Sequence, residues 1–188
     1  MKHKIFIISG VSGAGKGTII NRVLKTGKFD LARGINATTR PKEKRDEKDP
    51  HFQFVDIPKF KAMIKKGELL EYDFHHWNYY GTNRLILENL LKEHNILMEA
   101  DVNGGLEIKK KMAGVVLIYI TVDLEILKNR IKRRGNETQE EIEMRIKRAA
   151  LENQKGESYD YQVENPEGHP EIAINKVLEI IADELQNK

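Results

Sequence analysis

The sequence contains no cysteine. This absence excludes a disulfide framework, cysteine-ligated zinc, an iron–sulfur cluster and a thiol nucleophile, and it is typical of proteins from a reducing compartment. Long hydrophobic runs are missing too, since no stretch approaches the roughly 20 apolar residues that a helix needs to cross a bilayer. Near the N-terminus the apolar part covers only residues 5–8, which is too short for a signal peptide. We therefore expect a cytoplasmic protein with no membrane partner.

An excess of charge of one sign is also lacking. The 32 Lys and Arg residues oppose 29 Asp and Glu residues, so the net charge of the 188-residue chain is only +3. We expect no nucleic-acid partner, because such partners select clustered basic charge rather than a small global excess. With 39% hydrophobic and 32% charged residues, the chain has the composition of a globular protein. Its length is that of one ordinary domain, and we expect a single domain over residues 1–188.

The sequence does contain an alternation of buried strands and amphipathic helices. Three runs are apolar apart from Lys4, as in strands that are covered on both faces, and they lie at residues 4–8, 96–98 and 115–120. Helical patterns lie at residues 15–27, 103–112, 123–134 and 171–185. This order favours an α/β fold, in which right-handed crossovers place helices on both faces of a parallel sheet.

The middle of the chain, residues 34–90, has a different pattern. It contains a short apolar piece at 52–55 and a helical pattern near 58–66. We interpret it as an insertion with small antiparallel strands, laid over the parallel sheet. Residues 40–51 carry five basic and four acidic side chains, which predicts an exposed loop.

A glycine-rich turn joins the first strand to the first helix and matches the pattern G-x-x-x-x-G-K. Its members are Gly10, Val11, Ser12, Gly13, Ala14, Gly15, Lys16, Gly17 and Thr18. The glycines let the backbone N–H groups point inward, the helix N-terminus adds a favourable dipole, and Lys16 brings a positive charge to the β- and γ-phosphates. Gly17 stands where the usual pattern has Ser or Thr, and Thr18 follows one place later. The turn predicts an ATP site.

Further motifs, in the same order and spacing, resemble those of one family, guanylate kinase, among the P-loop nucleoside monophosphate kinases. They are Asn36-Ala37-Thr38-Thr39-Arg40, Glu71, Asn78-Tyr79-Tyr80-Gly81-Thr82, Asp101-Val102-Asn103-Gly104, Arg130, Arg134-Gly135, Arg145 and Asp160-Tyr161-Gln162-Val163-Glu164-Asn165. The resemblance covers nearly the whole chain. It implies a P-loop NTPase-type three-layer α/β fold with a parallel central sheet, a small mixed GMP-binding insertion and a helical lid. The core would cover about residues 1–33 and 91–188, the insertion about 34–90 and the lid about 128–150.

The resemblance also implies the activity. ATP would donate a phosphoryl group to GMP, and also to dGMP, in purine nucleotide metabolism, and Mg²⁺ would assist an in-line transfer that yields GDP from GMP. The implied partners are the small-molecule substrates ATP and GMP, and the protein would be a monomer or a homodimer.

Roles in substrate binding follow from the same resemblance. ATP would be bound by residues 10–18 together with Asn165, and GMP by Asn36, Arg40, Glu71, Tyr80, Gly81, Thr82 and Asp101. The residue types suit GMP, because guanine presents N1–H and an exocyclic NH₂ that a carboxylate such as Glu71 accepts. Thr82 would reach O6, and adenine would leave the acceptor on Glu71 unpaired. Arg40, Asn36 and Tyr80 would donate to the phosphate.

Catalytic and metal-binding roles are implied in the same way. The catalytic residues would be Lys16, Arg40, Arg130, Arg134 and Arg145. Three of these arginines belong to the lid, where they would stabilise negative charge on the transferred phosphoryl group. Glu99 and Asp101 follow a predicted strand, where ligands bind in open α/β sheets. Together with Thr18 they would hold Mg²⁺, mostly through water.

Two positions depart from the family pattern. Glu43 stands where the family has a second phosphate-binding arginine, and Phe52 stands where it has a tyrosine. The lost charge could be replaced from the same loop by Lys42, Lys44 or Arg45. These departures leave two alternatives open, which are a non-catalytic guanylate-kinase-like interaction module and a kinase that acts on another small phosphate acceptor.

The adjacent histidines His75 and His76 predict no metal site. Neighbouring side chains on a strand point to opposite faces, and no third ligand is spaced nearby. We interpret both as ordinary strand residues.

Overall fold

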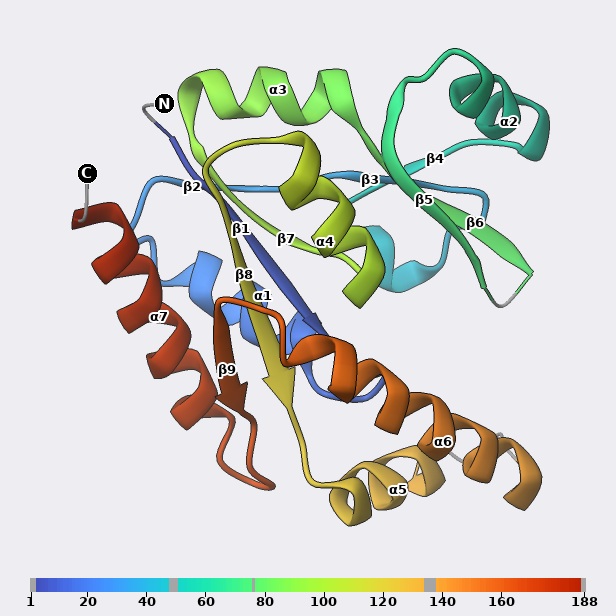
Figure 1. The fold of residues 1–188 in the computed structure, drawn as a ribbon, viewed down its shortest axis with the longest axis vertical. Coiled ribbons are helices and arrows are strands. Elements are labelled where there is room, and N and C mark those ends of the chain that lie inside the picture. The colour runs from blue at the N-terminus through green and yellow to red at the C-terminus, as the bar shows by residue number, and fades with distance from the viewer. Residues whose placement is uncertain (1–2, 48–50, 76, 134–137, 187–188) are drawn as a thin grey trace.

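The central element of the fold is a five-stranded sheet in which all strands are parallel. The computed structural model describes residues 3–47, 51–75, 77–133 and 138–186 (Figure 1). The strands of the sheet are β1 (Ile5–Gly10), β2 (Leu31–Arg33), β7 (Asn95–Glu99), β8 (Val115–Thr121) and β9 (Tyr161–Glu164). Their order in the sheet is β2-β7-β1-β8-β9. The predicted α/β fold with a parallel central sheet is confirmed.

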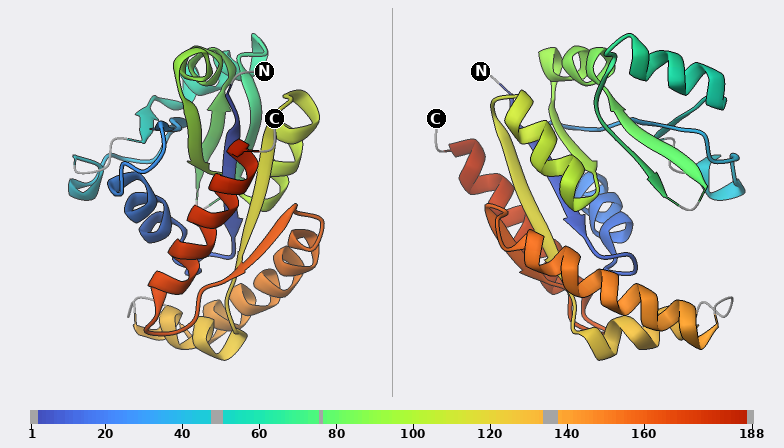
Figure 2. Two further views of the ribbon diagram at one scale, coloured as in Figure 1. Left: turned by 90° about the vertical axis from the view of Figure 1, so that its left-hand side faces the viewer. Right: turned by 45° about the vertical axis from the view of Figure 1, so that its right-hand side comes forward.

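Helices cover both faces of this sheet, as the edge-on view in Figure 2 shows. One face carries α1 (Lys16–Lys25) and α7 (Pro170–Gln186), and the other carries α3 (Arg84–Glu93) and α4 (Val102–Lys111). The side chains of β1 alternate between the two interfaces. Phe6 and Ile8 pack with α1 and α7, whereas Ile5 and Ile7 pack with α3 and α4. All four are 0% exposed, which explains why the strand is a continuous apolar run.

A second, smaller sheet contains four strands in the order β4-β3-β6-β5. They are β3 (Asn36–Thr38), β4 (Phe52–Phe54), β5 (Leu69–His75) and β6 (Asn78–Asn83). The sheet is mixed, because β3 pairs with β4 in parallel and with β6 antiparallel. Helix α2 (Ile57–Lys65) covers it through Phe60 and Met63, which pack against Ala37. Between β3 and β4 the chain forms a short 3₁₀ helix, η1 (Lys44–Glu47).

Two further helices, α5 (Leu124–Arg133) and α6 (Gln139–Gly156), follow β8. A capping box begins α6: Thr138 Oγ1 accepts from Glu141 N at 3.3 Å, and Thr138 N donates to Glu141 Oε2 at 2.7 Å. In Figures 1 and 2 these helices and the second sheet lie at opposite ends of the molecule. Within the described ranges, no helix is both long and apolar enough to cross a membrane.

Candidate active site

The glycine-rich turn lies between the carboxyl end of β1 and the first turn of α1, as the sequence predicts. Gly15 caps α1 with a φ of 90°, a conformation that side chains other than glycine's rarely adopt. A Cβ atom there would lie 2.5 Å from Asn165 Nδ2. Asn165 is buried just after β9, and its Nδ2 donates to Ala14 O at 2.7 Å. The end of β9 therefore holds the turn in place from the side.

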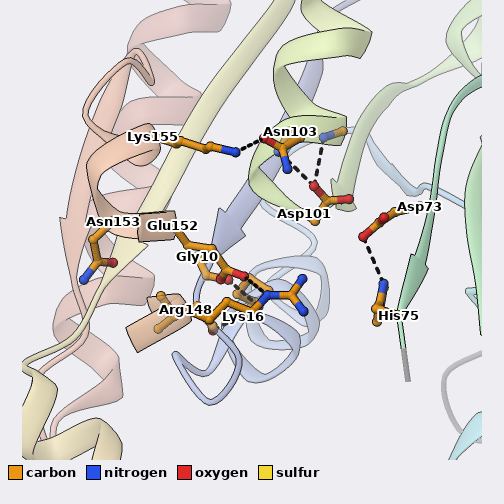
Figure 3. A network of polar contacts seen from close by, with 12 residues as sticks. Gly10, Lys16, Asp73, His75, Asp101, Asn103, Arg148, Glu152, Asn153 and Lys155 are labelled. Carbon is orange, nitrogen blue, oxygen red and sulfur yellow. Dashed lines mark hydrogen bonds and ion pairs between the residues drawn. The ribbon is translucent and has the colours of Figure 1, made fainter. Parts of the chain in front are cut away.

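Lys16 is the first residue of α1, and its side chain is only 13% exposed. Its Nζ donates to Gly10 O at 2.7 Å and to Val11 O at 3.2 Å, and it lies 3.5 Å from Glu99 Oε1. Figure 3 shows the side chain lying across the turn. A full positive charge thus lies beside the glycine-rich turn at the N-terminus of a helix, which is a favourable place for phosphate.

The turn from β7 into α4 carries the two strand-end carboxylates. Glu99 ends β7, and Asp101 caps α4, where its Oδ1 accepts from the backbone N–H groups of Asn103 at 2.8 Å and Gly104 at 3.0 Å (Figure 3). The amide nitrogen of Asn36 reaches the same turn from β3, because it donates to Glu99 O at 2.8 Å. Asp101 is therefore held in one orientation beside the second sheet.

Two buried hydroxyls fix this turn, and the sequence reasoning missed both. Ser9 Oγ donates to Ala100 O at 2.8 Å, and Tyr159 Oη donates to Ser9 Oγ at 2.8 Å. Burial raises the pKa of Tyr159, so its hydroxyl stays a donor. A Cβ on Gly105 would lie 2.3 Å from Tyr159 Oη. The glycine pair at 104–105 was the available signal that another group approaches closely here.

Three neighbouring strands bring Glu71, Thr82 and Asn36 together in the second sheet. Thr82 pairs with Glu71 on β5 and with Asn36 on β3. The buried Thr82 hydroxyl donates to Glu71 Oε1 at 2.6 Å and lies 3.1 Å from Asn36 Oδ1. A Cβ on Gly81, the neighbour of Thr82, would lie 2.8 Å from Glu71 O, so only glycine fits there.

Glu71 is a perturbed carboxyl group. Its pKa is raised from 4.5 to about 7, mainly by burial and also by the nearby Asp101 and Asp73 carboxylates, while the hydrogen bond from Thr82 acts in the opposite direction. A cavity of about 90 Å³ opens beside it, lined by Glu71, Tyr72, Asp73, Asp101, Asn103, Gly104 and Glu107. A ligand that donates hydrogen bonds would stabilise the ionised form of Glu71 here.

Arg40 lies at the far end of β3, where its side chain is held by carboxylates. Asp46 Oδ1 accepts from Nη2 at 2.7 Å, Asp46 Oδ2 accepts from Nη1 at 3.1 Å, and Glu43 Oε1 accepts from Nη1 at 3.1 Å. These bonds raise the pKa of Arg40. The guanidinium carbon also lies 5.2 Å from the ring centroid of Phe52 and 5.4 Å from that of Phe54.

The remaining predicted residues that the structure describes lie on α1, β6, α5, α6 and the loop after Arg40. Tyr80, on β6, lies 6.2 Å from Phe52 between ring centroids. Thr18 is exposed in the first turn of α1, and Lys42 and Lys44 are exposed in the loop after Arg40. Arg145 lies on α6, Arg130 on α5 and Arg45 in η1. The structure does not describe the side chains of Arg130 and Arg45, and Arg134 lies outside the described residues. Among the described residues, no group of three or more His, Cys, Asp or Glu side chains could hold a metal ion.

A glycine-rich turn at the carboxyl edge of a parallel sheet, beside a second sheet that presents an arginine and a buried carboxyl group, defines the fold of a P-loop kinase. The solved structures that resemble the chain have this fold. A guanylate kinase from Anaplasma phagocytophilum matches with a TM-score of 0.77 at 24% identity, covering 99% of this chain and 88% of that one. A shikimate kinase from Bacteroides thetaiotaomicron matches with a TM-score of 0.52 at 12% identity, covering 95% of this chain and 98% of that one.

Sequence relatives identify the family. The profile described as guanylate kinase matches residues 2–184. A guanylate kinase of Syntrophomonas wolfei is 39% identical over 187 residues, which cover 97% of this chain and 93% of that protein. A guanylate kinase of Thermotoga maritima is 34% identical over 187 residues, which cover 98% and 88%. The chain belongs to the guanylate kinase family.

Proposed function

We propose that this protein transfers the γ-phosphoryl group of ATP to GMP, yielding ADP and GDP, with dGMP as a second acceptor. The observation that carries the proposal is the Glu71–Thr82 pair, which offers a carboxylate and a hydroxyl side by side next to the Asp101 turn. Guanine has N1–H and NH₂ donors and an O6 acceptor on one edge, so this pair matches it. Adenine would leave the carboxylate without donors, which favours GMP over AMP.

The donor nucleotide would bind at the glycine-rich turn. Residues 10–18 would surround its phosphates with backbone amides, and Lys16 would exchange its bonds to Gly10 O and Val11 O for bonds to phosphate oxygens. Asn165 would act by holding the turn through Ala14 O. We propose that Asn165 also contacts ATP itself.

The metal site would consist mainly of phosphates and water. Glu99 fits this role because its side chain is 36% exposed and lies beside Lys16 at the mouth of the turn. Asp101 has one oxygen engaged in capping α4, which leaves it suited to a contact through water, and Thr18 is exposed nearby on α1. When bound, Mg²⁺ neutralises charge on the phosphates of ATP.

The acceptor phosphate would be bound by Arg40, Asn36 and Tyr80. No general base is required, because an oxygen of the GMP phosphate is already a nucleophile near neutral pH. Charge that spreads over the transferred group would be stabilised by Lys16 and by Arg130, Arg134 and Arg145 of the lid, at about residues 128–150. We assign the acceptor site to about residues 34–90, the core to the remainder, and the protein to purine nucleotide metabolism in the cytoplasm.

The proposal is tested by a coupled assay for ADP release with MgATP and each of GMP, dGMP, AMP, CMP and UMP. We expect turnover with GMP and dGMP and little with the others. Absence of turnover with GMP would overturn the proposal. Turnover with a phosphate ester that lacks guanine, at a rate equal to that with GMP, would instead favour a kinase for another acceptor.

A further inference from the structure

His75 is a candidate acceptor-site residue that the predicted set leaves out. It is the last residue of β5, the strand that also carries Glu71. Because side chains alternate along a strand, Glu71, Asp73 and His75 share one face. The alternate residues Tyr72 and Phe74 are 53% and 50% exposed on the other face. His75 therefore lies on the face of β5 that carries the guanine-recognition residue.

Tyr80 and Asp73 both contact the ring of His75. It stacks on Tyr80 with 4.2 Å between ring centroids and 8° between ring planes. Its Nδ1 lies 3.3 Å from Asp73 Oδ2, and the His75 side chain is 28% exposed. Figure 3 shows Asp73 and His75 extending from β5 toward the side on which Asp101 and Lys16 lie. The ring thus has a defined orientation at an accessible position.

A row of contacts links this ring to Arg40. His75 stacks on Tyr80, the Tyr80 ring lies 6.2 Å from that of Phe52, and the Arg40 guanidinium lies 5.2 Å from the same Phe52 ring. Two of these residues, Arg40 and Tyr80, are among the side chains proposed to donate to the acceptor phosphate. A phosphate bound between them would lie beside the edge of the imidazole.

An additional donor would complement Arg40 at the acceptor phosphate. The Arg40 guanidinium is bonded to Asp46 and to Glu43, so part of its hydrogen-bonding capacity is already used. An incoming phosphate would add further negative charge to this cluster. Phe52, which lies beneath the guanidinium, has no polar group to donate. A hydrogen-bond donor from another strand would add to those that Arg40 and its own loop supply.

We propose that His75 binds the phosphate of the acceptor nucleotide through Nε2, and that Asp73 orients the ring through Nδ1. This inference rests on the proposed function. An imidazolium ring donates from both nitrogens, so it can bond a carboxylate on one side and a phosphate oxygen on the other. His75 is then a binding residue, and Asp73 is a positioning residue.

The test compares GMP with guanosine, which has the same base and ribose but no phosphate. His75→Phe keeps an aromatic ring on Tyr80 and removes the donor. We expect this variant to bind GMP about tenfold more weakly in calorimetric titration, as the loss of a hydrogen bond between charged groups implies. Binding of guanosine, followed by ligand-observed NMR, is expected to be unchanged. Asp73→Asn is expected to weaken GMP binding a few-fold relative to guanosine binding; this ratio reports the positioning role, because Asp73 also lines the cavity beside Glu71 and can affect both ligands.

A matched control is His94→Phe. His94 Nδ1 lies 2.6 Å from Asp30 Oδ1, so it forms the same kind of pair, and it does so just before β7, at the end opposite Glu99. We expect its GMP affinity to equal that of the wild type. Thermal unfolding of every variant identifies any that fails to fold. If His75→Phe fails to fold, the comparison of GMP with guanosine is made with Asp73→Asn.

The binding results decide whether His75 contacts the acceptor phosphate. Equal losses for GMP and guanosine in His75→Phe would overturn the inference, because the ring would then act on the base or on the fold. Unchanged GMP binding would overturn it as well. The double variant His75→Phe/Asp73→Asn tests the positioning role. If it binds GMP more weakly than His75→Phe by the full effect of Asp73→Asn alone, the two residues act independently and the positioning role is overturned. If the wild type itself neither binds nor phosphorylates GMP, the proposed function fails, which is a different result.

Discussion

Asp46 holds Arg40 in a two-point ion pair, with Oδ1 2.7 Å from Nη2 and Oδ2 3.1 Å from Nη1. The Asp46 side chain is only 3% exposed, and that of Arg40 is 12% exposed. The pair uses the end of the guanidinium formed by its two terminal nitrogens. A second edge, formed by Nε and Nη2, has the same fork geometry and suits a phosphate. Asp46 can therefore fix the direction in which Arg40 meets the acceptor.

The first prediction concerns Asp46→Asn. This change removes one charge of a buried pair and leaves Arg40 less firmly oriented. We expect KM for GMP to rise about tenfold, and the free energy of unfolding to fall by about 2 kcal/mol. Steady-state kinetics and urea unfolding measure the two effects.

Glu179→Gln is the control for Asp46→Asn. It breaks the pair between Lys176 and Glu179, whose atoms lie 3.0 Å apart with side chains 58% and 62% exposed. Exposed pairs contribute little, so we expect a change within about 0.5 kcal/mol and unaltered kinetics. An Asp46→Asn variant with a lower KM for GMP would show that Asp46 competes with the substrate instead.

The second prediction concerns pH and the buried carboxyl group of Glu71. Its pKa is raised to about 7 by burial, against the ordinary value of 4.5. Guanine donors require the ionised form, so binding of GMP must remove the proton wherever Glu71 is protonated in the free enzyme. Below pH 7, KM for GMP should therefore rise with falling pH, by up to about tenfold per unit. Between pH 7 and 8 it should level off.

Kinetics between pH 5.5 and 8.5 test this, with Glu71→Gln as the control because its side chain does not titrate. The phosphate of GMP titrates in both enzymes, so the difference between their profiles reports Glu71. Parallel profiles would contradict the assignment of the pH effect to this residue.

The third prediction is that Glu71→Gln relaxes the choice of base. The Gln side chain has one acceptor oxygen where the carboxylate has two, so it accepts fewer hydrogen bonds from guanine. Its NH₂ group can instead donate a hydrogen bond to adenine. We expect the ratio of kcat/KM for GMP over AMP to fall on the order of 100-fold. An unchanged ratio would show that Glu71 does not select the base.

The fourth prediction is that Lys16→Ala removes turnover without unfolding the protein. Lys16 is the charged group at the mouth of the glycine-rich turn, and its bonds go to Gly10 O and Val11 O rather than into the core. We expect kcat/KM for ATP to fall on the order of 10³-fold, while GMP affinity and the circular dichroism spectrum stay unchanged. Substantial residual turnover would contradict the role assigned to Lys16.

The main sheet could be predicted wherever its strands are covered on both faces. β1 and β8 are continuous apolar runs, and the sequence identifies both. β2 has three half-buried residues, and β9 has an alternating pattern with one buried side chain. Neither contains an apolar run, so neither was predicted. Pairing with β7 and β8 determines that these segments are strands, and pairing with a distant strand leaves no local pattern.

In the acceptor site too, contacts between distant parts of the chain could not be predicted from local sequence. The residues near Glu71 could be named from motif spacing, whereas the pairing of Arg40 could not. Residues 40–51 have the mixed charge of an exposed loop, yet Asp46, within η1, is only 4% exposed and forms an ion pair with Arg40. The contact between Ser9 and Tyr159 joins residues 150 positions apart. Such contacts depend on how the chain folds back, which local composition does not encode.

The last prediction tests the support that the end of β9 gives to the glycine-rich turn. Gly15→Ala would combine an unfavourable φ of 90° with a Cβ atom 2.5 Å from Asn165 Nδ2. The bond from Asn165 to Ala14 O would then have to break or the turn would have to shift. We expect KM for ATP to rise at least about tenfold, with GMP affinity unchanged.

Gly168→Ala separates backbone strain from the clash with Asn165. Gly168 also has a positive φ, 77°, but a Cβ there would have no described atom within 4 Å. Both variants should lose about 1 kcal/mol of folding free energy through strain, measured by urea unfolding. Only Gly15→Ala should also lose ATP affinity, because only there does the new methyl group reach the residue that supports the phosphate-binding turn. Equal ATP kinetics in the two variants would contradict a supporting role for Asn165.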